Sequence, residues 1–521
     1  MRYHINFHTI LLIFIVFLGL SLRVYRLAEV PSGFFADEAS IGFNAYSVLA
    51  TGKDEYRKSF PFFFRSLDDY KGPVYIYSAI PFIYIFGLNE FSTRLPAALY
   101  GTGTIIFIYL LTKKLLNANK HKKEMAVFSS FFLAISPWHV HISRIAFEQS
   151  PFVFFTTAGL YFFIKSRVNL KLLFLSILLF ATAFYSYSAA KIFIAVFMSL
   201  LFMIYDKTFL KTKRIIFLCA LLALFSLLPF IYNLFASPIL SRWQQVSIFS
   251  QPPQDHTIVS HILNNYLSHF SLDFLFLKGD IDMPGQFIAR HSVRGLGEMH
   301  LFQLPLLILG FIYLSFKPEK RLISTLMLWL ILYPVGSMFT IAESAQATRS
   351  IVGVVPFQII SAVGLFYIFS FLSRIRKLFN RIITLGILII IVFSSIYYLH
   401  LYFTKYPLYS SDYWGWQYGY RSILEEFKKQ EGQYDQLLIT HRFNRGEELL
   451  NFYNVSHDCK KCVVMTNPIS IDSYKRQLFA LRQDDIAEAK TLYDDFLFIK
   501  QKNIYIPNGN AEIFIGKFVK H

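Results

Sequence analysis

Charged residues are what this chain has least of. Asp, Glu, Lys and Arg together make up only 16% of its 521 residues, whereas hydrophobic residues make up 55% and aromatic residues 18%, and the mean hydropathy is +0.43. Soluble domains carry more charge and fewer apolar side chains than this. The composition therefore excludes a soluble globular protein and indicates an integral membrane protein.

Strand-like alternation is missing from the apolar segments. They are continuous runs, which indicates membrane-spanning helices rather than the strands of a barrel. The first run is not a cleavable signal peptide, because it is long, is followed by Arg23 and Arg26, and lacks a small-residue cleavage pattern. We predict an all-α polytopic protein with about eleven spans, and up to thirteen. The predicted spans are Ile5–Leu22, Leu95–Leu116, Met125–Ser136, Pro151–Ile164, Leu170–Tyr185, Ile192–Tyr205, Ile215–Phe235, Leu301–Phe316, Leu322–Phe339, Ile351–Phe371 and Ile382–Phe403.

Acidic residues are fewer than basic ones, with 33 Asp and Glu against 51 Lys and Arg and a net charge of +18. In a soluble protein this excess would suggest a nucleic-acid partner. Here nearly all of it lies in short gaps between apolar runs, at about residues 113–123, 165–171, 206–214, 317–321 and 374–381. The positive-inside rule places these loops and the N-terminus in the cytoplasm. The intervening loops and the C-terminal segment are then expected outside the cytoplasmic membrane, and no nucleic-acid partner is expected.

The outer side receives three long pieces of chain. They are a loop at about 23–94, a loop at about 236–300, and residues 404–521, so we predict a membrane domain over 1–403 and an extracytoplasmic domain over 404–521. Within the first loop, Pro73–Gly87 is apolar but too short to span, and predicts an interfacial helix. In the C-terminal segment, Ser422–Gln430, Gln436–Thr440 and Glu447–Tyr453 alternate helix-like and strand-like patterns, which predicts a small α/β domain with an ancillary role.

Cysteine is also scarce, with three in the chain. Cys219 lies within a predicted span, and Cys459 and Cys462 form a close pair. No second pair of ligands follows at a suitable spacing, so this pair favours a local disulfide or two free thiols over a zinc site.

The predicted outer loops hold most of the ionisable residues that could carry chemistry. A carboxylate there can take a proton from an attacking hydroxyl. Lys and Arg, or a divalent ion held by carboxylate and imidazole, can stabilise a departing phosphate, and aromatic residues can hold a polyprenyl tail or a sugar face. This set fits glycosyl transfer from a lipid phosphate. The candidates are Asp37, Glu38, Asp68, Asp69, Lys71, His139, His141, Arg144, Glu148, Lys191, Arg290, His291, Arg294, Glu343 and Arg349.

Several motifs resemble a known family. They are Pro31-Ser-Gly-Phe followed by Asp37-Glu38-Ala, then Asp69-Tyr-Lys-Gly-Pro73, Gly87-Leu-Asn-Glu-Phe-Ser-Thr-Arg-Leu-Pro96 and Ser136-Pro-Trp-His139. Together they resemble the bacterial and archaeal branch of the protein O-mannosyltransferase superfamily (glycosyltransferase family 39-like), which includes the lipid A aminoarabinose transferases. The resemblance is strong over about residues 20–190, recurs at Arg290-His291 and Ala347-Thr-Arg349, and weakens in the C-terminal segment.

The resemblance implies a GT-C fold and transfer of a sugar from a polyprenyl phosphate, commonly with inversion. By likeness, Asp37 is the catalytic general base and Glu38 its companion. Asp69 and Lys71 match an acid and a base near the donor phosphate or a metal ion, although here Tyr70 intervenes and Gly72 replaces the first proline of the usual motif. The remaining implied site residues are Arg144, Glu148, Lys191 and Arg349 as substrate contacts, and His291 as a contact to a divalent metal or phosphate.

Each group also has a plainer interpretation. Asp37 and Glu38 could serve only to begin a helix, Asp69 and Lys71 could be a solvated charge cluster, and the two histidines at 139 and 141 could be hydrogen-bonded within the fold. For the whole chain, the alternative is a transporter or flippase for a lipid-linked sugar. Transporters carry polar sites near the membrane midplane and often inverted repeats, whereas this chain shows neither. The sugar, and whether the acceptor is a protein, a lipid or a glycan, stay open.

Overall fold

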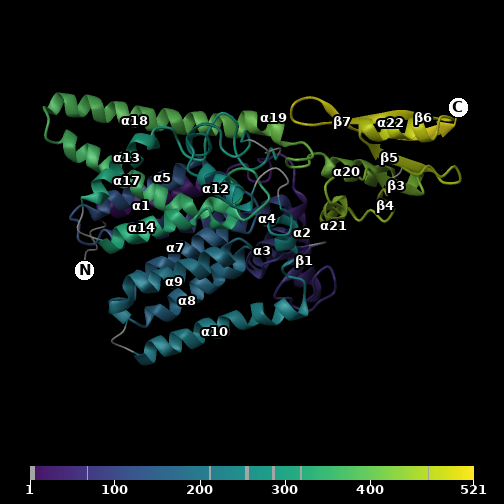
Figure 1. Cartoon of the computed structure of the whole chain (residues 1–521). Helices are drawn as coiled ribbons and strands as arrows, with labels where there is room; N and C mark the ends of the chain where they lie inside the picture. The colour runs from purple at the N-terminus through teal and green to yellow at the C-terminus, as the bar shows by residue number, and fades with distance from the viewer. Residues whose placement is uncertain are drawn as a thin grey trace.

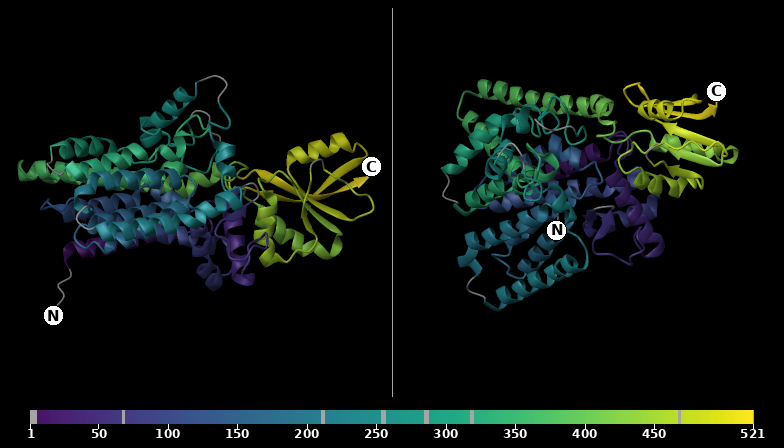
Figure 2. Two further views of the ribbon diagram at one scale, coloured as in Figure 1. Left: turned by 60° about the horizontal axis from the view of Figure 1, so that its bottom comes forward. Right: turned by 45° about the vertical axis from the view of Figure 1, so that its right-hand side comes forward.

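The computed structural model describes residues 6–66, 69–209, 213–252, 257–283, 288–316, 320–466 and 469–520. A long helical bundle carries a small α/β domain at one end (Figure 1). Helix α1 (Phe7–Val24) begins at the end of the bundle away from this domain, as the left view of Figure 2 shows. The all-α membrane part and the small C-terminal α/β part predicted from the sequence are thus both present. Ile5 and Asp68 lie outside the described residues, as do positions 210–212 and 317–319 of two basic loops.

Every predicted span overlaps a helix of the bundle. Six helical stretches are long and apolar enough to cross a membrane, namely Phe7–Val24, Glu90–Leu115, Arg214–Ala236, Lys320–Met338, Ala347–Leu372 and Lys377–Ser410. The other predicted spans are shorter apolar helices, so the number of crossings and their sidedness stay predictions. The bundle helices are α1 (Phe7–Val24), α4 (Glu90–Leu115), α5 (Lys122–Ile135), α7 (Gln149–Lys165), α8 (Leu172–Ser186), α9 (Ala190–Phe209), α10 (Lys213–Ala236), α13 (Gln303–Ser315), α14 (Lys320–Leu332), α17 (Val354–Leu372) and α18 (Lys377–His400).

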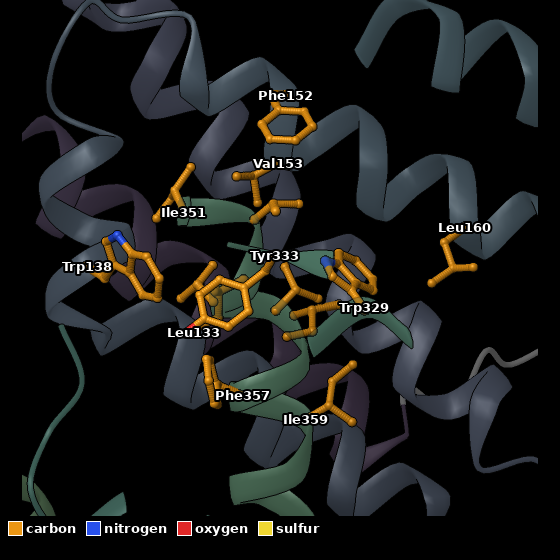
Figure 3. Packing of buried hydrophobic residues seen from close by; sticks show 14 of the residues in the cluster. Leu133, Trp138, Phe152, Val153, Leu160, Trp329, Tyr333, Ile351, Phe357 and Ile359 are labelled. Atoms are coloured by element: carbon orange, nitrogen blue, oxygen red, sulfur yellow. The ribbon is translucent and has the colours of Figure 1, made fainter. Parts of the chain in front are cut away.

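Small residues and aromatic rings hold the bundle together. α13 packs against α17 because Gly310 and Gly364 carry no side chain, and a Cβ at either would collide with a carbonyl oxygen of the facing helix. Trp138, Tyr333 and Phe357 lie in the same buried cluster (Figure 3). The Trp138 indole donates a hydrogen bond to the Ala347 carbonyl at 2.9 Å. This contact ties the core to the short helix that carries Arg349.

Short elements connect the bundle helices at the end nearest the C-terminal domain. β1 and β2 form an antiparallel hairpin with Phe64 opposite Lys71, and α3 coincides with the predicted interfacial helix. Asn89 caps α4 by accepting a hydrogen bond from the Ser92 N–H at 2.9 Å. The short elements are α2 (Ala36–Thr51), β1 (Phe64–Ser66), β2 (Asp69–Lys71), α3 (Pro73–Phe86), α6 (Pro137–Ile142), α11 (Ser241–Val246), α12 (Ile258–Ser268), a π-helical turn (Asp273–Leu277), α15 (Val335–Met338), α16 (Ala347–Ser350), a 3-10 turn (Ile351–Gly353), a second π-helical turn (Leu401–Lys405) and α19 (Tyr406–Ser410).

The C-terminal domain is a five-stranded sheet with helices. Its strand order is β4-β3-β5-β7-β6, with β3 parallel to β4 and β5, and β7 antiparallel to β5 and β6. Cys459 and Cys462 form a disulfide, one of the two states predicted. The elements are α20 (Tyr420–Gln430), a 3-10 turn (Glu431–Gln433), β3 (Gln436–Ile439), α21 (Gly446–His457), β4 (Cys462–Val464), β5 (Gln477–Leu481), α22 (Gln483–Leu492), β6 (Phe496–Tyr505) and β7 (Ala511–Lys520).

Two buried clusters meet a short way after position 404, where we predict the second domain to begin. Tyr406 and Trp416 still belong to the buried cluster of the bundle, whereas Tyr420 belongs to that of the C-terminal domain. The second cluster also contains Phe34 and Ala39 from the first outer loop and α2. The C-terminal domain therefore packs directly against the segment that carries the first acidic pair.

Candidate active site

One cavity of about 650 Å³ lies where the bundle, the short elements and the C-terminal domain meet. This volume is typical of sites for small molecules. It brings together seven of the nine site residues predicted from the sequence: Asp37, Asp69, Lys71, Glu148, Lys191, His291 and Arg349. Its lining holds three carboxylates and six cationic side chains. The three cations of the lining outside that set of nine are Arg242, Arg290 and Arg445.

Asp37 is placed in the first turn of α2, where unpaired backbone N–H groups favour a negative charge. The Lys71 ammonium lies 2.9 Å from Asp37 Oδ1, and a guanidinium nitrogen of Arg445 lies 3.8 Å from the same oxygen. Burial alone would raise the pKa of this carboxyl, but Lys71, Arg445 and Arg290 outweigh burial and hold it well below its ordinary value. Asp37 is therefore ionised, and no described residue donates a hydrogen bond to its Oδ2.

Lys71 ends strand β2, and the hairpin with β1 directs it at Asp37. Its side chain is 7% exposed. Burial would lower the pKa of the Lys71 ammonium, but Asp37, Glu148 and Asp69 together raise it above its usual value. Lys71 is therefore a permanent cation of the cavity.

Gly72 explains the departure from the family motif. Its N–H donates a hydrogen bond of 2.7 Å to Glu148 Oε1, which proline could not do because it has no N–H. A Cβ at this position would collide with the Tyr185 carbonyl oxygen. The local geometry at this position thus requires glycine and excludes proline.

Glu148 lies directly before α7, with its carboxylate in the cavity. Burial raises the pKa of this carboxyl to about 7, although Lys71 and the Gly72 N–H both lower it. Glu148 is thus balanced between its two protonation states near neutral pH, in contrast to the fully ionised Asp37.

Three cations line the cavity together with apolar residues. Arg242 of α11 lies 4.0 Å from Asp69. Lys191 lies in the first turn of α9, and Arg349 belongs to α16. Within the described parts of the chain, no carboxylate oxygen lies within 4.0 Å of either side chain. These cations are therefore available to an anionic ligand. The apolar lining includes Phe230, Ile239, Leu240, Trp243 and Val246.

His291 is held by a buried carboxylate. Its Nδ1 lies 3.4 Å from Asp280 Oδ2, which also accepts the Ala347 N–H at 3.0 Å, while Asp280 Oδ1 accepts the Ser292 hydroxyl at 3.0 Å. Burial lowers the pKa of His291, and attraction to Asp280 offsets this only in part. The ring is neutral at pH 7 and borders the cavity.

Asp69 and His291 are the two residues expected to bind a metal ion. The described ranges contain no group of three or more His, Cys, Asp or Glu side chains arranged to hold one. Asp69 is instead near Arg242, and His291 is hydrogen-bonded through Nδ1. The side chains around these two residues do not form a ligand set for a metal, so we derive no step through one.

Glu38 and Arg144 do not line the cavity. Glu38 is fully buried and accepts two hydrogen bonds of 2.8 Å from the Arg94 guanidinium and one of 2.8 Å from the Ala146 N–H. Arg144 donates hydrogen bonds to the backbone carbonyls of Leu22, Tyr25 and Val30. Both positions favour a structural role, which is to fix the segment around the start of α2 so that Asp37, the residue before Glu38, reaches the cavity.

The two histidines of α6 are hydrogen-bonded within the fold, as in their plainer interpretation. His139 Nδ1 contacts the Arg23 guanidinium at 2.7 Å, and His141 Nε2 contacts the Arg290 carbonyl at 2.7 Å. Arg290 itself stacks its guanidinium 3.7 Å from the Phe35 ring centroid and faces the cavity.

No motif in the sequence marks Arg242, Asn444 or Arg445 as site residues. Arg242 is an isolated base in a long outer loop, and the other two belong to a domain expected to be ancillary. The Arg290-His291 pair was indicated by the sequence, because the family resemblance recurs at these two residues. Only the fold brings these positions to Asp37.

Comparison with known proteins agrees with this geometry. Residues 70–233 match the family model described as dolichyl-phosphate-mannose-protein mannosyltransferase. The structure is similar to ArnT from Cupriavidus metallidurans bound to undecaprenyl phosphate, with a TM-score of 0.55 and 11% identity over 98% of this chain and 97% of that one. No curated protein sequence matches the chain.

A second similar structure is the oligosaccharyltransferase of Archaeoglobus fulgidus, with a TM-score of 0.53 and 15% identity over 90% of this chain. The chain spans 65% of the length of that larger protein. Together these comparisons confirm the GT-C fold and the predicted resemblance to the glycosyltransferase superfamily related to ArnT.

Proposed function

We propose that this multi-pass protein with a GT-C fold is a membrane glycosyltransferase, which moves a sugar from a polyprenyl-phosphate donor to an acceptor hydroxyl with inversion. One observation carries the proposal: an ionised carboxylate, Asp37, faces a cavity whose cations outnumber its carboxylates by six to three. The carboxylate can accept the proton of the acceptor hydroxyl, and the cations can stabilise the negative charge of a phosphate.

In the proposed reaction, Asp37 Oδ2 accepts the proton of the acceptor hydroxyl. The hydroxyl oxygen forms a new bond to the anomeric carbon of the sugar as the bond from that carbon to the phosphate oxygen breaks. The bonding electrons leave with the polyprenyl phosphate, whose negative charge grows in the transition state. The new bond forms on the face opposite the departing phosphate, which inverts the anomeric centre.

The cations at the apolar part of the cavity are assigned to the phosphate. Among the described residues, no carboxylate oxygen lies within 4.0 Å of Lys191 or Arg349, and Arg242 lies 4.0 Å from Asp69. Fixed cations directed at a position where charge develops lower the barrier most effectively in a site that excludes water. Phe230, Leu240 and other apolar lining residues next to Arg242 are assigned to the start of the polyprenyl chain.

Two structures of similar fold support a lipid-phosphate donor. ArnT was solved with undecaprenyl phosphate, and the Archaeoglobus oligosaccharyltransferase with an inhibitory peptide and a dolichol-phosphate. These ligands belong to those proteins. For this chain, we assign the same chemical class of donor because the cavity joins cations to an apolar wall, and we leave the acceptor as protein, lipid or glycan.

Glu148 and Asp69 are assigned to the substrate rather than to proton transfer from the acceptor. Glu148 is held by the Gly72 N–H and lies near Lys71 and Lys191. A carboxyl there can accept hydrogen bonds from sugar hydroxyl groups. We assign Asp69, beside Arg242, to orienting that guanidinium toward the phosphate.

Whether a divalent ion takes part in transfer is tested with a chelator. The Archaeoglobus oligosaccharyltransferase has also been solved in complex with zinc and sulfate. In this chain the proposal assigns charge stabilisation to Lys and Arg side chains. A chelator is therefore expected to leave transfer largely intact, and loss of activity that returns with added magnesium or manganese would assign a metal to the site.

The proposal is tested with purified protein in liposomes that contain native membrane extract. A panel of radiolabelled polyprenyl-phosphate sugars is supplied with and without chelator, and label in protein, lipid and glycan fractions is counted. Transfer from at least one donor, abolished by Asp37→Asn but not by Asp273→Asn, supports the enzyme. Asp273 is a matched control because it lies outside the cavity and pairs with Lys278 at 2.7 Å. Movement of labelled lipid across the bilayer without sugar transfer would instead support the flippase.

A further inference from the structure

The C-terminal domain reaches the cavity at one place. Among its described residues, only Asn444 and Arg445, in the loop before α21, line the cavity. Arg445 is 24% exposed at its side chain, and its guanidinium lies 3.8 Å from Asp37 Oδ1. A domain expected to be ancillary thus places a cation beside the carboxylate assigned as general base.

The backbone at Arg445 is unusual. It has φ 56° and ψ 54°, the left-handed conformation that L-residues other than asparagine and aspartate rarely adopt, and it immediately precedes the first residue of α21. A non-glycine residue keeps this conformation only where the surrounding structure imposes it, and such residues cluster at functional sites. The conformation therefore calls for an explanation beyond helix capping, because the Arg445 side chain makes no capping hydrogen bond.

The docking of α21 fixes where Arg445 lies. α21 packs against α2, the helix that carries Asp37, with ring centroids of Phe452 and Phe34 4.6 Å apart. Gly42 of α2 allows this approach, since a Cβ there would lie 2.6 Å from the Phe452 ring. The packing of α21 thus fixes the position of Arg445, the residue directly before this helix, relative to Asp37.

A second contact fastens the same helix to the bundle. Glu90, at the start of α4, accepts a hydrogen bond of 2.7 Å from the Tyr453 hydroxyl and an ion-paired hydrogen bond from Arg421. Arg445 is not needed for this docking, because aromatic packing and Glu90 already supply it. Its guanidinium is free to serve the cavity.

Arg442, three residues earlier, shows what a purely structural arginine does in this loop. Its guanidinium donates hydrogen bonds of 2.7 Å to Asp485 and 2.8 Å to Glu488, both within the C-terminal domain. The Arg445 guanidinium, in contrast, donates no hydrogen bond to any residue that the structure describes. It faces Asp37 across the cavity, on the oxygen that Lys71 also contacts.

We propose that Arg445 is a positioning residue for Asp37 and that the C-terminal domain thereby completes the active site. The inference rests on the proposed function of Asp37. Arg445 and Lys71 hold Oδ1 between them, which turns Oδ2 toward the acceptor hydroxyl and keeps the proton-accepting oxygen free.

The test compares Arg445→Gln with Arg442→Gln, which removes the same charge from the same loop outside the cavity. Sugar transfer is measured with varied donor and with native membranes as acceptor. We expect Arg445→Gln to lower kcat about 10- to 100-fold, as small misplacements of catalytic groups do, with the donor KM changed less than about threefold. Arg442→Gln should keep the wild-type kcat. Arg445→Lys should retain an intermediate kcat, and millimolar guanidinium chloride should partly restore Arg445→Gln but not Asp37→Asn.

Thermal unfolding of each variant in detergent separates the outcomes. If Arg445→Gln unfolds early, Arg445→Lys and the guanidinium rescue decide the matter, because a role in docking would give no rescue. An unchanged kcat in Arg445→Gln, or an equal loss in Arg442→Gln, would overturn the inference. If Asp37→Asn remains active, the proposed function itself fails. If Asp37→Asn is inactive while Arg445→Gln is normal, only the role of Arg445 fails.

Discussion

Replacing Asp37 by asparagine separates proton transfer from the acceptor from binding of the donor phosphate. The change keeps the size and hydrogen-bonding reach of the side chain but removes its charge and basicity. General-base catalysis contributes about 10²- to 10⁴-fold, so we expect kcat to fall about 10³-fold, which corresponds to about 4 kcal/mol in the barrier. Because the depressed pKa of Asp37 keeps it ionised at any assay pH, the loss should be similar at pH 6 and pH 8.

Binding of the donor should change in the opposite direction. Asp37 repels a phosphate in the same cavity, and two unit charges about 10 Å apart at an effective dielectric constant of about 20 repel by about 1.7 kcal/mol. Removing that charge also releases Lys71 from a 2.9 Å ion pair. We therefore expect affinity for polyprenyl phosphate to rise by up to about tenfold.

Two measurements on the same purified variants check this. Transfer from a radiolabelled polyprenyl-phosphate sugar gives kcat, and quenching of intrinsic fluorescence by unlabelled polyprenyl phosphate gives the affinity. Asp273→Asn serves as the control for loss of one carboxylate. Residual transfer above about a tenth of wild type in Asp37→Asn would refute the role of general base, and clearly weaker lipid binding would refute the charge argument.

Four further changes test other parts of the reasoning. Glu38→Gln breaks a fully buried ion pair, which costs about 3–5 kcal/mol in the free energy of unfolding. The unfolding temperature should therefore fall, while the kcat of the folded variant stays within about tenfold of wild type. A variant of normal stability with no activity would instead make Glu38 catalytic. Gly72→Ala places a Cβ against the Tyr185 carbonyl oxygen. The free energy of unfolding should fall by about 1–3 kcal/mol, and sugar transfer should be reduced. A variant that is stable and active would contradict the close contact at this position. Burial and the neighbouring Glu448 raise the pKa of Glu55 to about 8, so the folded protein retains a proton that the unfolded chain releases near pH 4, and stability should fall between pH 5 and pH 8. Glu55→Gln should flatten that slope and raise the unfolding temperature at pH 8 only, and an equally steep slope would exclude Glu55 as its source. Arg349→Gln should raise the donor KM about tenfold or more and change kcat less, whereas an unchanged KM would remove Arg349 from the phosphate site.

Adjacent residues in the first acidic pair show where sequence reasoning reached its limit. Asp37 and Glu38 are both carboxylates near the start of one helix, and the motif alone assigns both to catalysis. Successive side chains on a helix point about 100° apart, so only one faces the cavity. Arg94, 56 positions further along the chain, pairs with Glu38 in the interior, and Asp37 is left to face Lys71.

The C-terminal domain shows the same limit on a larger scale. Three of its elements, α20, β3 and α21, were predicted from the sequence, because periodic patterns reflect which face of an element is buried. Its part in the cavity was not, because Arg445 has no motif and its position depends on how Phe452 packs on Gly42. Packing of side chains between distant segments cannot be read from local patterns.

The sequence by itself determined that this is a polytopic helical membrane protein with the GT-C fold, and it indicated most of the ionisable residues that line the cavity. Long apolar runs, clustered loop charges and short motifs are local properties of the chain, so they can be recognised without knowledge of the fold. The tertiary structure decided which carboxylate is solvent-facing, why glycine replaces proline at position 72, and that the last domain reaches the cavity. Those outcomes depend on hydrogen bonds and close contacts between segments that are tens to hundreds of residues apart, which form only when the chain folds and its two parts pack together.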